Sequence, residues 1–356
     1  MPDTLTKIAY QTFQQGKQYF GFAHKTLSTR LMNTVSPRQR HEPNPLTPDM
    51  LQSIQARISE LLEVDWQDAE DGVYPKWALF ENRWDDFFRY YPEMCLDIPS
   101  IWDRANDKRH QDFSNGVNTA GYPDYYIQNF HHQTDGYFSD TSANLYDLQV
   151  EVLFNGTADP MRRRILAPLK RHLSKMETPI GNTPQPLKVL DIACGTGNSL
   201  KLIDQAMPEA ALYGVDLSPA YLRKAHDNLS HVDGIPAQLI QANGEALPFI
   251  DAFFEATTST FLFHELPAEA RQNVIDEAFR VTKPGGIFVI CDSIQKADTP
   301  EFAPMMENFP ATFHEPYYRH YIADDLVARL ETAGFTDVQT STHFMSKYWV
   351  AYKPAV

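Results

Sequence analysis

A glycine-rich turn followed by an acid one strand later is the pattern in this sequence with the clearest chemistry. A buried apolar run over residues 188–194 ends in Gly195-Thr196-Gly197 and passes directly into a helix-forming stretch. This order predicts a parallel strand that turns tightly into a helix beside a ligand. Asp216 closes a second apolar run about 20 residues further on, where an acid at a strand tip accepts both hydroxyls of a ribose. The spacing therefore predicts a nucleoside site.

Two residues near this turn indicate which nucleoside the site takes. A dinucleotide site needs a third small residue so that the helix N-terminus can approach a pyrophosphate, but Leu200 stands at that place. Asp191, on the strand before the turn, would repel phosphates and attract a ligand that carries an ammonium group. S-adenosylmethionine meets both conditions.

Four motifs in order resemble those of the class I S-adenosylmethionine-dependent methyltransferases, especially the branch around the ubiquinone and menaquinone C-methyltransferases. The motifs are Asp191–Gly197, Val215–Pro219, Asn243–Phe249 and Arg280–Gly286, within a resemblance that covers residues 185–353. At Asn243 the family usually has Asp. The resemblance implies that S-adenosyl-L-methionine, which becomes S-adenosyl-L-homocysteine, is bound by Asp191, Ala193, Gly195, Thr196, Gly197, Asp216, Leu217, Asn243, Gly244, Glu245 and Thr260.

Three residues are candidates for moving a proton near the expected methyl position. His264 follows the fourth predicted strand, and histidine is the side chain best able to take a proton near neutral pH. The alternative is that His264 caps the following helix or bonds a backbone carbonyl. His314 with Glu315 can deprotonate a hydroxyl or an activated carbon, and the alternative there is a surface turn. Methyl transfer itself mainly needs an in-line approach near about 3 Å.

Two aromatic-rich segments are expected to line the acceptor site. Thr299–Tyr321 is long and rich in aromatic and Met side chains, which predicts a functional lid. The stretch Tyr122–Tyr137 lies upstream of the first motif, where the resembled family commonly closes over cofactor and acceptor. No metal is expected at His131-His132, because adjacent histidines point apart and no other ligand follows at a metal-binding spacing. The candidate acceptor-binding residues are Tyr126, His131, Tyr137, Met305, Phe313 and Tyr317.

Composition excludes several classes of protein. With 43% hydrophobic and 12% aromatic residues, the 356-residue chain can form a substantial core over two to three domains. No stretch approaches about 20 uninterrupted apolar residues, and the N-terminus lacks the apolar centre of a signal peptide. A net charge of −15 argues against a nucleic-acid substrate and favours a small-molecule acceptor. Cys95, Cys194 and Cys291 are too scattered for a disulfide framework, so a reducing cytoplasm is expected.

The first 40 residues differ in charge from the rest of the chain. They carry a net charge of +5, which leaves −20 for the remainder. Apolar residues at roughly helical spacing predict one or two amphipathic helices in this segment. Such a segment can rest on an anionic membrane surface, where a lipid-like acceptor would be found, or can pack on the catalytic part. A linker that reaches residue 46 is indicated by Pro37, Pro43, Pro45 and Pro48.

Residues 47–175 are expected to form a mostly helical accessory domain that caps the substrate. Thr47-Pro48 is typical of a helix start. The aromatic stripe from Trp77 to Tyr91 predicts a second helix with a buried face, and further helices are expected at 143–154 and 160–174. A hinge rich in proline follows, at Pro179, Pro184 and Pro186.

Residues 185–356 alternate strand and helix, which predicts the α/β class with a doubly wound, seven-stranded, Rossmann-like sheet. The last two strands are separated by only a short turn, so they must pair antiparallel, as is characteristic of the resembled family. The expected strands lie near 188–194, 211–216, 236–242, 253–261, 286–292, 336–344 and 346–353.

The sequence thus predicts a methyltransferase that acts on carbon or oxygen of a small, largely apolar or aromatic acceptor. A quinol, phenol, polyketide-like or lipid-linked ring would fit. One alternative is a nicotinamide-dependent oxidoreductase on the same sheet, against which Leu200 and the antiparallel last strand speak. The other is a non-catalytic module that keeps the fold and binds a ligand or partner.

Overall fold

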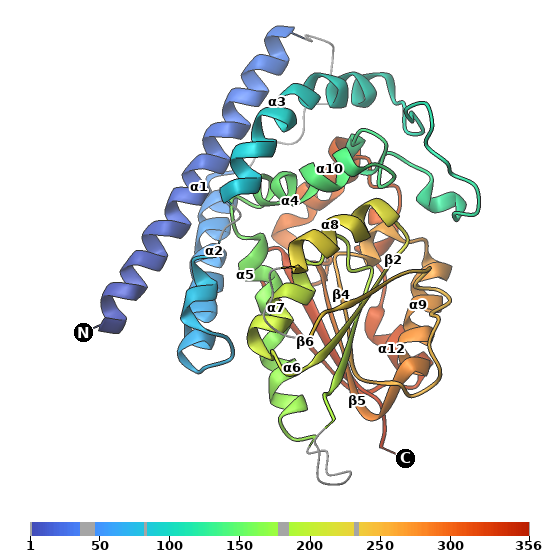
Figure 1. Ribbon diagram of the computed structural model, residues 1–356. Helices are drawn as coiled ribbons and strands as arrows, with labels where there is room; N and C mark the ends of the chain where they lie inside the picture. Colours follow the sequence, from blue (N-terminus) through green and yellow to red (C-terminus); the bar gives the residue numbers. More distant parts are fainter. Residues whose placement is uncertain (1, 36–46, 82–83, 177–184, 231–234, 356) are drawn as a thin grey trace.

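A seven-stranded sheet lies at the centre of the molecule, with helices on both faces and a helical assembly over one end (Figure 1). The computed structural model describes residues 2–35, 47–81, 84–176, 185–230 and 235–355. The proline-rich linker and the hinge expected from the sequence fall mostly at 36–46 and 177–184, outside the described residues.

The strand order is β3-β2-β1-β4-β5-β7-β6, with β7 antiparallel to both of its neighbours. The other neighbouring strands pair in parallel, so the predicted doubly wound sheet with an antiparallel last strand is confirmed. The strands are β1 (Lys188–Ile192), β2 (Ala211–Asp216), β3 (Gln238–Gln241), β4 (Phe254–Thr260), β5 (Thr282–Ser293), β6 (Thr336–His343) and β7 (Ser346–Tyr352).

Strand β5 begins earlier than the sequence indicated. Its pairing with β4 starts at Thr282 opposite Phe254, and then shifts to Ile287 opposite Ala256. The extra residues form a bulge in which Gly285 has a φ of 77°. The expected start at residue 286 corresponds to the regular part of the strand beyond that bulge.

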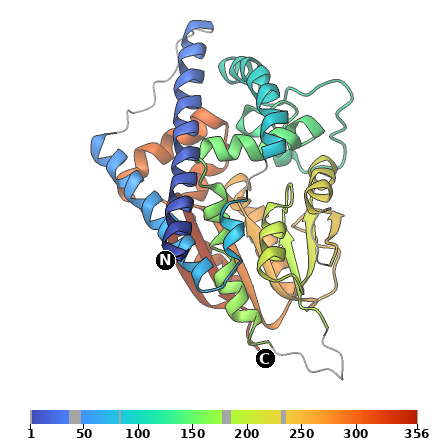
Figure 2. The ribbon, with the colours of Figure 1, turned by 60° about the vertical axis from the view of Figure 1, so that its left-hand side comes forward.

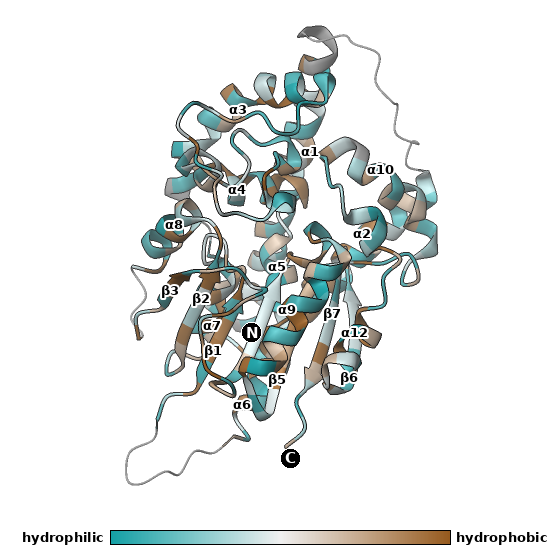
Figure 3. Ribbon diagram, turned by 90° about the vertical axis from the view of Figure 1, so that its right-hand side faces the viewer, coloured by the Kyte–Doolittle hydropathy of each residue, from teal (hydrophilic) through white to brown (hydrophobic). Residues whose placement is uncertain are grey.

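The two faces of the sheet are covered by different helices. In β1, Val189 packs in one buried cluster with α6 (Leu166–Leu173) and α7 (Asn198–Ala206). Leu190 and Ile192 belong to a second cluster, with α9 (Ala268–Val281) and α12 (Leu326–Ala333). Because both of their faces are buried, β1, β2 and the later part of β5 read as nearly continuous apolar runs, parts of which appear brown in Figure 3. Helix α8 (Pro219–Leu229) packs beside α7.

The amino-terminal segment is one helix, α1 (Pro2–Val35), which runs along the molecule beside α2 (Pro48–Glu70) (Figure 2). Thr47 caps α2 as predicted, because its Oγ1 accepts a hydrogen bond from the Met50 amide at 3.2 Å. The helices share a buried cluster with the sheet, so they add to its core. Within the described ranges, no helix combines the length and the apolarity needed to cross a bilayer.

A buried ion pair ties these helices together. Asp65 on α2 is fully buried and accepts hydrogen bonds from the hydroxyls of Tyr10 and Tyr74 at 2.5 and 2.8 Å. The guanidinium of Arg163 donates two more, at 2.8 and 2.6 Å. Arg163 ends the short helix α5 (Ala158–Arg163), so one carboxylate joins α1, α2 and α5.

Two helical predictions differ from the structure. The aromatic stripe is divided between a short turn, η1 (Lys76–Leu79), and α3 (Trp84–Asp107), and both Trp77 and Phe88 are exposed. Periodicity identifies a face of a helix but not whether another element covers that face. The helix expected at 160–174 is split into α5 and α6, since Pro168 lacks the N–H that would continue the helical hydrogen bonding.

The segment expected to be a long lid loop, Thr299–Tyr321, is mostly helical. It forms η5 (Pro300–Phe302), α10 (Ala303–Phe313) and α11 (Tyr318–Tyr321). Figure 1 places α10 above the sheet with α4 (Asp140–Leu153) and α3. Two further turns, η2 (Asp124–Tyr126) and η3 (Phe130–His132), come from the aromatic stretch upstream, and η4 (Phe263–Glu265) follows β4.

Candidate active site

The turn after β1 adopts backbone conformations that favour glycine. Gly195 and Gly197 have φ values of 54° and 82°, in the left-handed region. A Cβ on Gly197 would lie 3.2 Å from the Ala225 side chain, so the turn packs closely on α8. The Gly195 amide donates a hydrogen bond to the Asp216 carboxylate at 2.8 Å. The turn is therefore fixed to the tip of β2.

A cavity of about 110 Å³ opens at the carboxyl ends of β1, β2 and β4. It lies where a doubly wound sheet is expected to bind its ligand. The predicted residues that line it are Ala193, Gly195, Asp216, Leu217, Asn243, Gly244, Thr260, Tyr126 and Tyr137.

Four of the predicted cofactor residues do not line this cavity. Asp191 is buried in β1, where its carboxylate accepts a hydrogen bond from the Thr258 hydroxyl at 2.7 Å. The Thr196 side chain turns toward α4, and Gly197 packs on α8. Glu245 accepts hydrogen bonds from Tyr125 and Asn273, and its backbone amide donates one to the side-chain oxygen of Asn243.

The carboxylates at this end of the sheet have raised pKa values. Burial raises the pKa of Asp216 to about 6, although the Ser218 and Gly195 amides stabilise its charged form. Burial also raises the pKa of Asp191, to about 7. A cationic ligand beside these groups would relieve the cost of ionising them.

Two features exclude a pyrophosphate at the start of α7. Leu200 is completely buried at the position where a dinucleotide fold needs a small residue. Asp147 on α4 lies against the same helix end, where its carboxylate accepts hydrogen bonds from Thr196 and Asn198 at 2.7 Å each. The negative charge of Asp147 at this helix end would repel a diphosphate, as would that of Asp191. This counts against a nicotinamide dinucleotide as the ligand.

The residues present suit a cationic adenosyl ligand. Asp216 offers a carboxylate beside the turn, and Gly244 lines the cavity at a point where a Cβ would lie 3.0 Å from Ile192. The volume of about 110 Å³ is below the roughly 300–1,000 Å³ of typical ligand sites. To admit a ligand as large as S-adenosylmethionine, the cavity must therefore widen, which requires its aromatic wall to move outward.

A larger cavity, of about 800 Å³, lies beneath α1. It is lined by residues of α1, α3, α4 and α7, among them Phe13, Phe20 and Leu148. Neither the glycines of the turn nor Asp216 reach it. We therefore assign the cofactor to the smaller cavity.

The wall opposite the turn is aromatic. Tyr126, Phe130, Tyr137 and Tyr146 line it, and Tyr137 donates a hydrogen bond to Glu265 at 2.5 Å. Burial raises the pKa of Tyr126 and of Tyr137 well above the ordinary value, so both phenols stay neutral.

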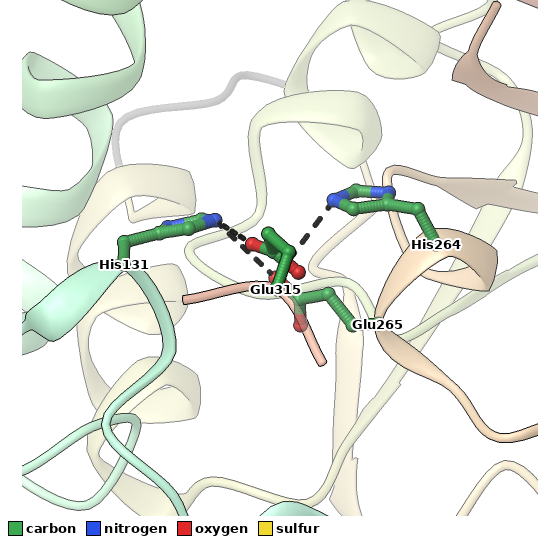
Figure 4. A group of neighbouring side chains, drawn as sticks. All are labelled: His131, His264, Glu265 and Glu315. Carbon is green, nitrogen blue, oxygen red and sulfur yellow. Dashed lines mark ion pairs between the residues drawn. The ribbon is translucent and has the colours of Figure 1, made fainter. Parts of the chain in front are cut away.

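The candidate base His264 lies in a group of ionisable side chains at the edge of the cavity (Figure 4). Its Nδ1 is 2.6 Å from the Asp292 carboxylate, and its Nε2 faces Glu265 at 4.0 Å. Burial lowers the pKa of His264, but the negative charge and hydrogen bond of Asp292 outweigh burial and raise that pKa to about 10. In this form the ring is charged near neutral pH and has no free site for a proton.

Glu315 and His131 join the same group, whereas His314 does not. Glu315 is fully buried and forms an ion pair with His131. His314, at the end of α10, stacks instead on His110 with ring centroids 3.7 Å apart. Burial and the neighbouring histidines lower its pKa to about 4. The structure thus separates the two residues predicted to act together.

The remaining acceptor candidates belong to the cap formed by α10 and the turn that follows it. Met305 packs against the buried cluster of the sheet, and Phe313 contacts Phe309. The Tyr317 hydroxyl lies 3.4 Å from the side-chain nitrogen of Gln128. Met305, Phe313 and Tyr317 are not among the residues that line the cofactor cavity.

Three residues of the site were missed from the sequence. Glu265 follows His264, and Asp292 lies at the end of β5, so the argument from strand tips that selected His264 applies equally to both. Asp147 gave no such signal, because a polar residue within an amphipathic helix is most often solvated.

Comparison with known proteins agrees with the site. A family model described as a methyltransferase domain matches residues 189–286. An uncharacterised methyltransferase of Synechocystis sp. is 32% identical over 152 residues, which are 43% of this chain and 68% of that protein. A ubiquinone/menaquinone biosynthesis C-methyltransferase of Desulfotalea psychrophila is 31% identical over 183 residues, 51% of this chain and 64% of that protein.

The chain thus spans about two thirds of the length of these relatives, which match about half of it. A solved S-adenosylmethionine-dependent methyltransferase from Methanosarcina mazei is similar at 21% identity and a TM-score of 0.39, covering 51% of this chain and 99% of that one. From the ordered motifs, the sheet and the sequence relatives, the chain belongs to the class I S-adenosylmethionine-dependent methyltransferases.

Proposed function

We propose that the protein transfers the methyl group of S-adenosylmethionine to an oxygen or carbon atom of a small, largely apolar or aromatic acceptor. The observation that carries this proposal is the cavity, where the turn after β1 and the tip of β2 face an aromatic wall. One relative is named for ubiquinone and menaquinone biosynthesis, which supports a ring-bearing acceptor.

The contribution of the chain itself is to bind, orient and exclude water. Asp216 would accept the ribose hydroxyls, and the turn at Gly195 allows the ligand to approach the backbone. The wall that contains Tyr126 and Phe130 would hold an apolar ring and keep water out. When bound, S-adenosylmethionine supplies a methyl group on a positively charged sulfur. Proximity of the two reactants then provides much of the acceleration.

Binding and transfer can be tested separately. S-adenosylmethionine and S-adenosylhomocysteine are titrated into the purified chain by calorimetry, and binding of both is expected. The chain is then incubated with methyl-labelled cofactor and an extract of its host. Label in a small, solvent-extractable product supports the proposal when, at sub-saturating cofactor, Asp216→Ala gives much less of it and the exposed control Asp227→Ala behaves as wild type. Failure to bind either cofactor form would exclude the activity, and label confined to nucleic acid or protein would exclude the acceptor class.

We further propose that α1 contacts an anionic lipid surface. One face of this helix packs on the body of the protein, where Tyr10 and Gln14 are buried. Its exposed apolar side chains can insert into a membrane, where a lipid-linked acceptor would lie. The basic charge of the first 40 residues favours binding to anionic lipid headgroups. These exposed side chains are Leu5, Ile8, Tyr19, Phe22, Leu27 and Leu31.

Sedimentation with vesicles tests this contact. Wild type is expected to pellet with phosphatidylglycerol vesicles and not with phosphatidylcholine vesicles. The double variant Leu27→Glu, Leu31→Glu should stay in solution, while Ile250→Glu, at an exposed site away from α1, should pellet normally. A wild type that remains in the supernatant with both lipids would refute the contact.

A further inference from the structure

Four ionisable side chains from three distant segments converge at the edge of the cofactor cavity (Figure 4). His131 comes from η3, His264 and Glu265 from η4, and Glu315 from the turn after α10. Each offers one nitrogen or oxygen, and these four atoms lie within 4.8 Å of one another. We call this group the His/Glu cluster.

Glu315 is the member whose environment demands a cation. Its side chain is 0% exposed, and neither carboxylate oxygen accepts a hydrogen bond from any described residue. Its contact in the cluster is the ion pair with His131. Glu265, the second carboxylate, lies 3.8 Å from the same ring. A buried and a largely buried carboxylate so close together are costly unless positive charge is shared between them, which protonated histidines or a metal ion can supply.

The His264 ring is held in the orientation of a metal ligand. Asp292 bonds Nδ1 at 2.6 Å, which leaves Nε2 directed toward the cluster. Asp292 is itself buried and accepts hydrogen bonds from the amides of Phe263 and Ser293. A carboxylate that orients a histidine from its far nitrogen is the usual support of a metal-binding imidazole.

The second histidine is placed in the same way. The Nε2 atom of His131 faces both carboxylates, and its Nδ1 lies 3.3 Å from the side-chain amide of Gln133. The neighbouring His132 does not enter the cluster. The expectation of no metal at His131-His132 rests on local sequence spacing, whereas the other ligands proposed here come from segments whose meeting no local spacing reveals.

We propose that the His/Glu cluster binds one divalent first-row transition-metal ion, such as Zn²⁺, Mn²⁺ or Fe²⁺. Two imidazoles with two carboxylates suit these ions, whereas Mg²⁺ and Ca²⁺ prefer oxygen ligands alone. Four ligands arranged tetrahedrally about 2.1 Å from an ion lie roughly 3.4 Å from one another. The four ligand atoms lie within 4.8 Å of one another, so side-chain movements of up to about 1 Å would close the cluster around such an ion.

The position of the ion narrows the acceptor class, and this step rests on the proposed function. Glu265 both belongs to the cluster and lines the cofactor cavity. A metal ion here would lie between that cavity and the cap formed by α10. It would hold an oxygen atom of the acceptor, so the acceptor carries a hydroxyl or carbonyl group beside the methylated atom. The metal then orients the acceptor, while the aromatic wall holds its ring.

Metal content and affinity test the site without reference to activity. The full chain is freed of metal with a chelator, loaded with ZnCl₂ or MnCl₂, desalted and measured by mass spectrometry. One ion per chain is expected, together with a higher melting temperature, because a ligand that binds only the native state stabilises it. Glu315→Gln and His264→Gln should each lose the bound ion. The matched controls Glu331→Gln and His226→Gln, at exposed positions on α12 and α8, should retain it.

Asp292→Asn serves as a milder variant, because it changes the support of His264 and leaves all four ligands in place. Its metal affinity should fall about 10–100-fold. A wild type that binds no ion, or Glu315→Gln with one ion per chain, overturns the site. S-adenosylmethionine is titrated into the metal-free chain in parallel. Cofactor binding without metal binding refutes the cluster alone, whereas metal binding without cofactor binding supports the cluster and refutes the proposed function.

Discussion

At the scale of single residues, Asp216 connects the turn to the expected ligand. Its carboxylate accepts amide hydrogen bonds from Gly195 and Ser218 at 2.8 Å each, and it lines the cavity. Asp216→Ala removes both of these hydrogen bonds and the carboxylate that would accept hydrogen bonds from the ribose hydroxyls. Hydrogen bonds to a charged group contribute about 1.5–3 kcal/mol, so affinity for S-adenosylmethionine should fall about 10–100-fold. Calorimetric titration measures this, and unchanged affinity would remove Asp216 from the binding site.

Asp191 makes the stability of the ligand-free protein depend on pH. Burial raises the pKa of its carboxyl from 3.8 to about 7. Between these values the native state keeps a proton that the unfolded state has released, so its contribution to stability is lost as the pH rises through this window. The free energy of unfolding of Asp191→Asn, measured by urea denaturation and compared with that of wild type, should therefore increase from about pH 5 to about pH 8. Exposed Asp227→Asn should show no such gain, and a pH-independent difference for Asp191→Asn would contradict the prediction.

The sequence places most of the predicted cofactor residues at the ends of parallel strands, which meet at one edge of a sheet. Seven of them line the cavity together, including Gly195 and Asp216. The His/Glu cluster could not be predicted in this way. His131 and Glu315 belong to irregular segments, and only the three-dimensional fold brings them together.

At the scale of elements, the packing of α7 on β2 depends on the absence of a side chain at Gly214. A Cβ there would lie 2.7 Å from Leu200 and 2.8 Å from Cys194. Gly214→Ala should destabilise the protein by about 1–3 kcal/mol, since overpacking a buried sheet forces its neighbours to move. Gly16→Ala, on α1 with no atom within 4 Å, should instead be neutral or stabilising by about 0.5–1 kcal/mol. Chemical denaturation distinguishes them, and equal effects would contradict the packing argument.

Elements with a strong period were predicted well, and those set by their surroundings were not. Strands β1, β2 and β5 followed from buried apolar runs, and α2 from its cap and its periodic apolar face. The segment Thr299–Tyr321 has no clean helical period and contains Pro304 and Pro310, so its sequence favours a loop over the helix α10 that the structure has. Exposure of Trp77 and Phe88 depends on neighbours that no local pattern describes.

At the scale of the whole molecule, Asp65 joins the amino-terminal helices to the body. Asp65→Ala would leave the Arg163 guanidinium buried without its partner, which typically costs about 3–5 kcal/mol. Glu60→Ala, at an exposed position on the same helix, should change stability by less than about 0.5 kcal/mol. The two variants are compared by their urea midpoints. If both midpoints match that of wild type, the ion pair does not stabilise the fold.

The Asp65 ion pair also bears on the order in which the chain matures during synthesis. Tyr10 leaves the ribosome well before Arg163, which at ordinary translation rates follows on the order of ten seconds later. During that interval α1 is a basic, amphipathic segment whose final neighbours do not yet exist. Chaperones and lipid headgroups can therefore bind α1 before it packs on the rest of the chain. The first of these helices to be synthesised is thus among the last to reach its final packing.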